Sequence, residues 1–111
     1  MIFKEGVDPL GLSAPAWYGL HIADGVHKQL TGQEVTCTST TEGTHSVLRS
    51  MHYTGAYGAG HGRAFDVRIW AFKDGPRLPE FVRRLKEELG DDYYVLLEKT
   101  HIHIHWGPVH R

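Results

Sequence analysis

The sequence predicts an α+β fold in which a small, mainly antiparallel sheet carries two helices on one face. Three observations predict it: two stretches with helical spacing of apolar residues, several short alternating or β-branched stretches, and their order along the chain. The chain has 111 residues, 41% of them hydrophobic, and it contains no visible internal repeat or linker. A chain of this length can bury one core, so we expect a single domain over residues 1–111.

The two helices are predicted from apolar residues that recur every three or four positions. The first helix is expected over Ala16–Leu30, with Ser13 as a capping residue in front and Gly32 just beyond its end. The second is expected over Pro79–Leu89, where Gly90 is a plausible stop.

Four short stretches predict strands. Glu34–Thr41 is β-branched at most positions, and Ala64–Trp70 alternates between apolar and polar residues. Tyr93–Leu97 and His101–Trp106 are expected to form two further strands or one hairpin, with its turn at Glu98–Thr100. Residues 42–62 are rich in Gly, Ser, Thr and His and predict a long loop.

Composition excludes several classes of protein. Twelve Lys and Arg residues against thirteen Asp and Glu give a net charge of −1, so we expect no nucleic-acid partner. Cys37 is the single cysteine, which rules out an internal disulfide framework and a cysteine-based zinc cage. The first residues contain no long apolar run, so we expect neither a signal peptide nor a membrane span, and we expect a monomer.

Nine histidines are the feature of composition that stands out, and three of them alternate in His101-Ile-His-Ile-His105. On a strand, His101, His103 and His105 share one face, and each is about 6.6 to 6.8 Å from the next along the strand. Two such imidazoles can surround one site, where one binds a metal and the other holds or deprotonates a water. The alternative is a solvent-facing edge strand on which histidine is merely tolerated.

Further ligands must come from another part of the chain, and the nearest candidates are His52 and Asp66. Two histidines and one aspartate suit Zn²⁺, with a fourth position open for water. Glu98 or His101 could serve as the base. In an unbroken strand Glu98 would point away from His101, so it reaches the site only if the chain turns or bulges between them; otherwise it is an exposed side chain.

These residues occur in motifs that resemble a known family. The pattern S-x-H-Y-x-G at 50–55, followed by G-R-A-x-D at 62–66, resembles the first motif of the LAS group of zinc peptidases. That group includes D-Ala-D-Ala carboxypeptidases and dipeptidases, phage endolysins that cut peptidoglycan peptides, and the hedgehog domain. Its late H-x-H strand resembles His101-Ile-His103.

The resemblance implies a hedgehog- or D-Ala-D-Ala-peptidase-like fold and a role for each matching residue. His52, Asp66 and His103 correspond to the zinc ligands, and His101 to a base or transition-state partner. Glu98 corresponds to the catalytic glutamate of the dipeptidase and endolysin branch. Glu98-x-x-His101 also matches that branch's E-x-x-H, in which the histidine is the ligand, so the two registers conflict. We favour His103.

Two departures from the family pattern concern the loop and the last histidine. Thirteen residues separate His52 from Asp66, more than the family usually has, which indicates an insertion of roughly Ala56–Gly62. His61 is the alternative first ligand. His105 stands where phage-type relatives often carry an acid, and a spare ligand, a substrate contact and a surface residue all remain open for it.

Substrate contacts are predicted from the residues around the motifs. Arg49, Arg63 and Arg68 flank them, and a guanidinium suits a substrate carboxylate; we select Arg49 and Arg63. Tyr53 and Trp106 could line the cleft. Solvated or packing roles are the alternatives for all of these residues.

The remaining four histidines have simpler expected roles. His21 and His27 are expected at the surface or boundary of the first helix, and His110 at a frayed terminus. His45 either supports the metal site or belongs to a polar loop.

The leading functional hypothesis is a zinc metallopeptidase that hydrolyses peptidoglycan peptides, of the D-Ala-D-Ala carboxypeptidase or endolysin type. One alternative is a nucleotide hydrolase, because H-I-H-I-H-W at 101–106 also resembles the histidine-triad signature. A second alternative is a catalytically silent, zinc-binding module similar to the hedgehog domain.

Overall fold

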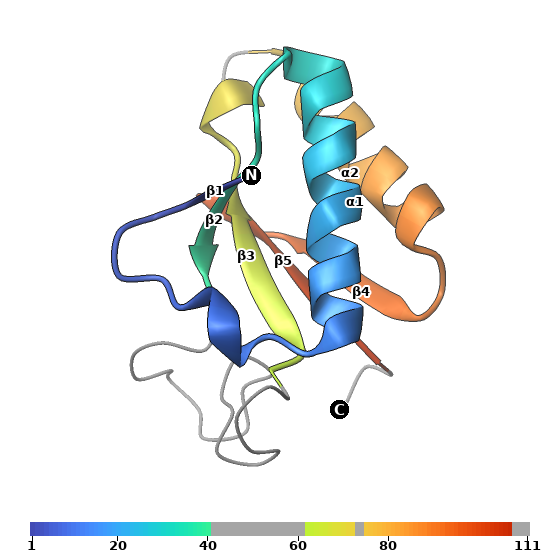
Figure 1. Cartoon of the computed structure of the whole chain (residues 1–111). Helices are drawn as coiled ribbons and strands as arrows, with labels where there is room; N and C mark the ends of the chain where they lie inside the picture. Colours follow the sequence, from blue (N-terminus) through green and yellow to red (C-terminus); the bar gives the residue numbers. More distant parts are fainter. Residues whose placement is uncertain (41–61, 73–74, 108–111) are drawn as a thin grey trace.

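A computed structural model describes residues 1–40, 62–72 and 75–107. These residues form a five-stranded sheet in the order β1-β2-β3-β5-β4, in which only the β1–β2 pair is parallel (Figure 1). The strands are β1 (Ile2–Phe3), β2 (Thr36–Ser39), β3 (Ala64–Arg68), β4 (Tyr93–Leu97) and β5 (His101–Trp106). The predicted α+β class with a mainly antiparallel sheet is confirmed.

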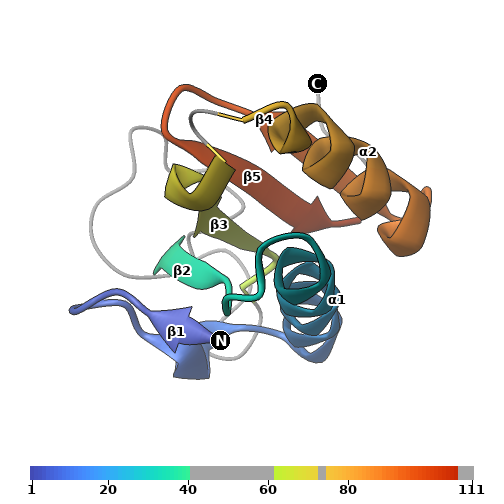
Figure 2. The same cartoon turned by 90° about the horizontal axis from the view of Figure 1, so that it is seen from above.

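Two helices, α1 (Ala14–Thr31) and α2 (Arg77–Leu89), lie on the same side of the sheet (Figures 1 and 2). Two short 3₁₀ helices, η1 (Pro9–Gly11) and η3 (Trp70–Phe72), lie in the connections. The opposite face of the sheet is covered by no helix of the described residues (Figure 2). No described helix is both long enough and apolar enough to span a bilayer.

Both helices end as the sequence predicts, at a glycine. Gly32 adopts a left-handed φ of 74° and donates its N–H to the Lys28 carbonyl, and Gly90, with φ 77°, donates to the Lys86 carbonyl. These bonds satisfy carbonyl groups that the last helical turn leaves without a partner. At the other end of α1, Ser13 has the extended backbone of an N-cap, but its hydroxyl makes no capping hydrogen bond.

Two strand predictions need correction, and one strand was not predicted. Of Glu34–Thr41 the structure forms β2 only at Thr36–Ser39, and β3 stops at Arg68 because the chain then turns into η3. β1 escaped prediction, since two residues are too few to show alternation; Ile2 and Phe3 pair with Thr36 and Cys37. The last two strands have the predicted bounds and form a hairpin.

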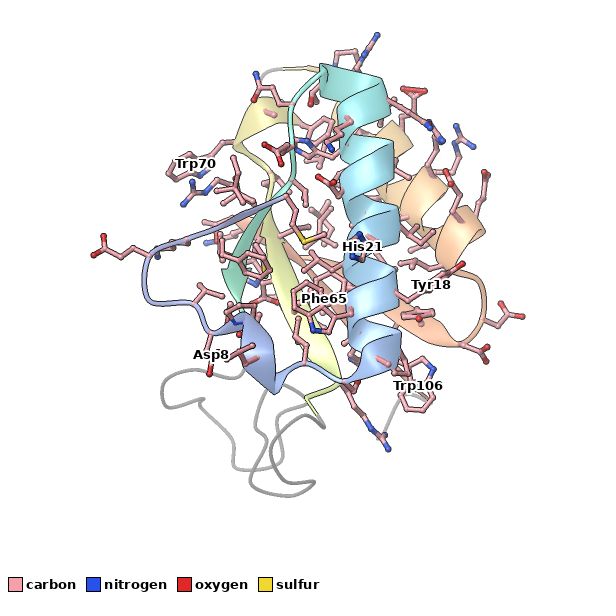
Figure 3. All side chains as sticks on the ribbon, in the orientation of Figure 1. Asp8, Tyr18, His21, Phe65, Trp70 and Trp106 are labelled. Carbon is pink, nitrogen blue, oxygen red and sulfur yellow. The ribbon has the colours of Figure 1, made fainter. Side chains whose placement is uncertain are left out.

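The core lies between the sheet and the two helices. Phe65 and Val67 of β3 and Ile102 and Ile104 of β5 are fully buried there (Figure 3 labels Phe65). Each buried side chain of this size contributes about 1.5–3 kcal/mol. Helix α1 approaches the sheet closely at Gly19, where an added Cβ would lie 2.9 Å from the Tyr93 ring.

His27 corrects the expectation of a surface or boundary residue, because it is only 3% exposed. Its ring lies edge-on to Phe72 and Phe81, and its Nδ1–H donates to the Gln33 carbonyl at 2.7 Å. The helical pattern places residue 27 on the inner face. The hydrogen bond to the Gln33 carbonyl offsets the free-energy cost of burying the imidazole. His21 is exposed, as expected.

Candidate metal centre

The pairing of β3 with β5 places the predicted site residues side by side. Asp66 is the register partner of His103, and Arg68 is the partner of His101. Directly paired residues of antiparallel strands project to the same side of a sheet. Because the neighbours of these residues in sequence fill the core, they themselves project to the side without a helix. We call this side the histidine face and define it by Asp66, Arg68, His101, His103 and His105.

The Asp66 carboxylate lies between two imidazoles of the histidine face. Its Oδ1 is 3.2 Å from His103 Nδ1, and its Oδ2 is 3.5 Å from His101 Nε2. The side chains of Asp66, His103 and His101 are 13%, 16% and 26% exposed. The carboxylate is therefore shielded from bulk water but remains accessible, as a site that admits substrate requires.

His105 is a buried partner of His103, which excludes the interpretation of His105 as a surface residue. It is 6% exposed, its Nδ1 lies 2.9 Å from His103 Nε2, and its ring packs on Tyr94 with centroids 5.0 Å apart. Both nitrogens of His103 thus face a specific group. If Nδ1 gives its lone pair to a cation, the Nε2–H of His103 can donate to His105, the kind of support that metal-ligating histidines usually have.

Glu98 reaches the histidine face through the hairpin turn. The chain reverses at Lys99–Thr100, and the Glu98 N–H donates to the His101 carbonyl at 2.9 Å. Glu98 therefore lies opposite His101 and not on the side of Ile102. Its Oε2 is 3.3 Å from His101 Nε2, with the side chain 43% exposed. The two candidate bases are in contact with each other.

The distances at Asp66 can be compared with those of a zinc site. Ligand atoms about 2.0–2.1 Å from a tetrahedral zinc ion are about 3.3 Å from one another. The 3.2 Å between Asp66 Oδ1 and His103 Nδ1 matches that separation. Among residues 1–40, 62–72 and 75–107, no three His, Cys, Asp or Glu side chains form a group that could hold a metal ion. Among the described residues, Asp66 and His103 are thus spaced as two ligands of one metal ion would be.

Several predicted site residues lie outside the described residues. These are His52, Arg49 and Tyr53, together with His45, His61, His110 and most of the proposed insertion. Of the described site residues, the structure brings together Asp66, Glu98, His101 and His103.

The predicted substrate contacts Arg63 and Trp106 form a pair of their own. The Arg63 guanidinium carbon lies 5.3 Å from the centre of the Trp106 ring, and the backbone N–H of Trp106 donates to the backbone carbonyl of Arg63. Strand alternation directs Trp106 to the side opposite His105, where it appears near the start of α1 (Figure 3). The histidine face thus gains no contact from the Trp106 ring.

Arg68 and Trp70 are the neighbours of the site that sequence reasoning did not select. The Arg68 guanidinium carbon lies 3.7 Å from the centre of the Trp70 ring, and Trp70 is 64% exposed. The sequence could have indicated Arg68, because residues 66 and 68 are two apart on the alternating strand and so project to the same side of the sheet. The turn into η3, which brings the Trp70 ring next to Arg68, leaves no such signal.

Comparison with protein-family models, with curated proteins and with solved structures finds no match to this chain.

Proposed function

We propose that the protein is a zinc-dependent peptidase that hydrolyses peptide bonds in bacterial peptidoglycan. The observation that carries the proposal is the Asp66 carboxylate, 3.2 Å from His103 and 3.5 Å from His101, with Glu98 in contact with His101. Two strands from distant parts of the chain thereby combine candidate ligands with a candidate base. The peptidoglycan substrate rests on the resemblance of the two motifs to the LAS group.

Asp66, His103 and His52 would hold the zinc ion, with His105 orienting His103. Zinc bound there supplies Lewis-acid polarisation of the scissile carbonyl and lowers the pKa of a coordinated water. The contacts of His103 support its role over that of His101 as the ligand, because it is the register partner of Asp66 and has His105 behind it.

Glu98 and His101 would move the proton. Glu98 accepts a proton from the attacking water, whose oxygen adds to the carbonyl carbon of the scissile bond. As the C–N bond breaks, the proton passes to the leaving nitrogen, so the products are a carboxylate and an amine. His101, 3.3 Å from Glu98 and 3.5 Å from Asp66, orients the Glu98 carboxylate, and in its protonated form it stabilises the negative charge on the carbonyl oxygen.

The direct test combines metal content with hydrolysis. The purified protein should contain zinc and release amino groups from purified peptidoglycan; a chelator should stop the release, and added zinc should restore it. Asp66→Ala should lose both zinc and activity. Asp91→Ala, an exposed aspartate outside the site, is the matched control and should retain both. A zinc-free protein that is inert on every type of peptidoglycan would refute the proposal.

The same experiments separate the two alternatives. A catalytically silent module would bind zinc and melt at a lower temperature after chelation, without hydrolysis. A histidine-triad hydrolase would cleave a nucleoside phosphoramidate and keep that activity in a His52→Ala variant, whereas the peptidase would lose its activity.

A further inference from the structure

We propose that Arg68, stacked on Trp70, binds a carboxylate group of the peptide substrate next to the residues that carry out hydrolysis. Arg68 is then a specificity-determining residue. This inference rests on the proposed function for its substrate, and it adds the charged group by which the substrate is selected.

Arg68 lies on the sheet beside the residues proposed for hydrolysis. It is the register partner of His101 and lies two residues from Asp66 on the same strand, so all three belong to the histidine face. Extending the pairing of Cys37 with Val67 by one residue sets Thr36 opposite Arg68. The row His101–Arg68–Thr36 thus adjoins the row that contains His103 and Asp66. Residues two apart on a strand are about 6.6–6.8 Å apart, a spacing that a dipeptide unit can bridge.

The Trp70 ring holds the Arg68 guanidinium in place. The guanidinium carbon lies 3.7 Å from the centre of the Trp70 ring, and this stacking occupies one flat side of the group. The N–H groups, which point outward in the plane, remain the part that can bind a ligand. Such a fork matches the two oxygens of a carboxylate, and stacking reduces the entropy that the arginine loses on binding. Figure 3 shows Trp70 projecting at the edge of the molecule.

The positive charge of Arg68 is not matched in the way that the charges of the arginines on α2 are. On α2, Arg83 pairs with Glu87 and Arg84 with Glu88. No carboxylate in the described part of the chain forms an ion pair with Arg68, whose guanidinium instead lies over the Trp70 ring. A positive charge beside a hydrolytic site and without an acidic partner among these residues is suited to an anionic ligand.

A surface pocket lies beside the stacked pair. It has a volume of about 180 Å³ and is lined in part by Arg68, Trp70, Thr36 and Glu34. That volume equals roughly six water molecules at about 30 Å³ each, which is enough for a carboxylate and the atoms next to it. Glu34 also lines the pocket, and the amino group of Met1, which contacts its carboxylate, offsets part of its repulsion of an anion.

The carboxylate could be at the end of the substrate or within it. A C-terminal carboxylate on the leaving residue would make the protein a carboxypeptidase. The free α-carboxylate of a glutamate linked through its side chain would be compatible with cleavage inside a stem peptide. The inference concerns the shared carboxylate, and the experiment distinguishes the two sources.

The test is a titration of the Trp70 indole N–H signal by NMR, assigned with Trp70→Phe, in the zinc-loaded protein. Three peptides are used: acetyl-D-Ala-D-Ala, its C-terminal amide, and an amidated peptide with an internal γ-linked D-Glu. We expect one or both carboxylate-bearing peptides to bind with an affinity at least tenfold higher than that of the neutral amide, as measured from the shift of this signal. The peptide that does so identifies the source.

Arg68→Gln should abolish this tenfold preference, whereas Arg83→Gln, an exposed arginine on α2, should preserve it. In hydrolysis assays Arg68→Gln should raise KM about tenfold and change kcat little. Equal binding of acid and amide by the wild type, or an unchanged preference in Arg68→Gln, would overturn the inference.

The titration needs no turnover, so the two proposals can fail separately. A carboxylate-dependent shift in a protein that cleaves no peptide would refute the peptidase and support the anion site. Zinc-dependent hydrolysis without any preference for a carboxylate would support the peptidase and refute the role of Arg68.

Discussion

The two faces of the sheet are built from the same strands but perform different tasks. On β5, Ile102 and Ile104 are fully buried under the helices, whereas His101 and His103 lie on the other face with 26% and 16% of their side chains exposed. Alternation along a strand makes this separation possible, since neighbouring residues project to opposite sides. The core face supplies stability, and the proposed function assigns the chemistry to the histidine face.

The largest expected difference in stability is between alanine substitutions of two adjacent residues, one on each face of the sheet. Ile104→Ala should lower the free energy of unfolding by about 2–5 kcal/mol, because it leaves a cavity in the core. His103→Ala should cost about 1–2 kcal/mol in the metal-free protein, because it removes the hydrogen-bonding contacts with Asp66 and His105. Urea unfolding in the presence of a chelator measures both. Equal losses in the two variants would show that the faces do not divide stability from chemistry.

The next effect concerns metal affinity and sharpens the role of the buried histidine. If the Nε2–H of His103 donates to His105 in the zinc-loaded protein, His105→Gln should weaken zinc binding about 10–100-fold, the usual cost of losing a partner behind a ligand. Competition with a chromogenic chelator measures the affinity.

His21→Gln is the matched control for that variant, since His21 is an exposed histidine on α1. It should leave zinc affinity unchanged. An unaltered affinity in His105→Gln would mean that packing against Tyr94, and not support of His103, explains its burial.

The third prediction tests how tightly the helices cover the core face. Gly19→Ala should destabilise the protein by about 1–3 kcal/mol, because the new Cβ would lie 2.9 Å from the Tyr93 ring, and that ring is held by a hydrogen bond from its hydroxyl to the Pro15 carbonyl. Gly25→Ala, on the same helix, meets nothing within 4 Å and should stabilise it by up to about 1 kcal/mol. Thermal and urea unfolding of both variants provide the measurement. A stabilising Gly19→Ala would contradict this close approach.

The same comparison explains what the sequence could predict. Local periodicity was sufficient for both helices, for β4 and β5, and for the shared face of His101 and His103. It also set the condition for Glu98, a turn after β4, which the structure meets. Where a pattern repeats over several residues, the physics is local and can be read from the chain.

Other features depend on contacts between distant segments, which periodicity does not encode. The pairing of Asp66 with His103 is a matter of strand register, and the stacking of Arg68 on Trp70 depends on the turn into η3. His27 was misjudged for a related reason. A histidine on a helix is usually exposed, and here its burial depends on the Gln33 carbonyl and on two phenylalanine rings. His52 lies outside the described residues, so its predicted role as a ligand stays a prediction.

The smallest expected effect on stability concerns Asp24, which can be contrasted with Asp66. Asp66 lies on the histidine face, whereas Asp24 on α1 is 8% exposed on the helix side of the molecule. Burial raises the pKa of Asp24, but the Val35 N–H, the Lys28 ammonium and the amino group of Met1 together outweigh it, so the net pKa lies below the ordinary value. Its Oδ1 accepts the Val35 N–H at 3.0 Å, and its Oδ2 is 3.2 Å from Lys28 Nζ. Asp24 thus connects α1 to the segment that leads into β2.

A carboxyl group with a lowered pKa stabilises the folded state above its unfolded pKa, which is about 3.9, and this contribution is lost as the pH falls through the folded pKa. Asp24→Asn should therefore cost on the order of 1 kcal/mol at pH 7, and the difference from wild type should shrink as the pH is lowered below about 4. Urea unfolding at pH 7, 5 and 3 measures this difference. A constant difference would mean that hydrogen-bond geometry, and not charge, is what Asp24 contributes. A difference that closes at low pH would establish Asp24 as a structural acid on the helix side, in contrast to Asp66, which we propose as a metal ligand on the histidine face.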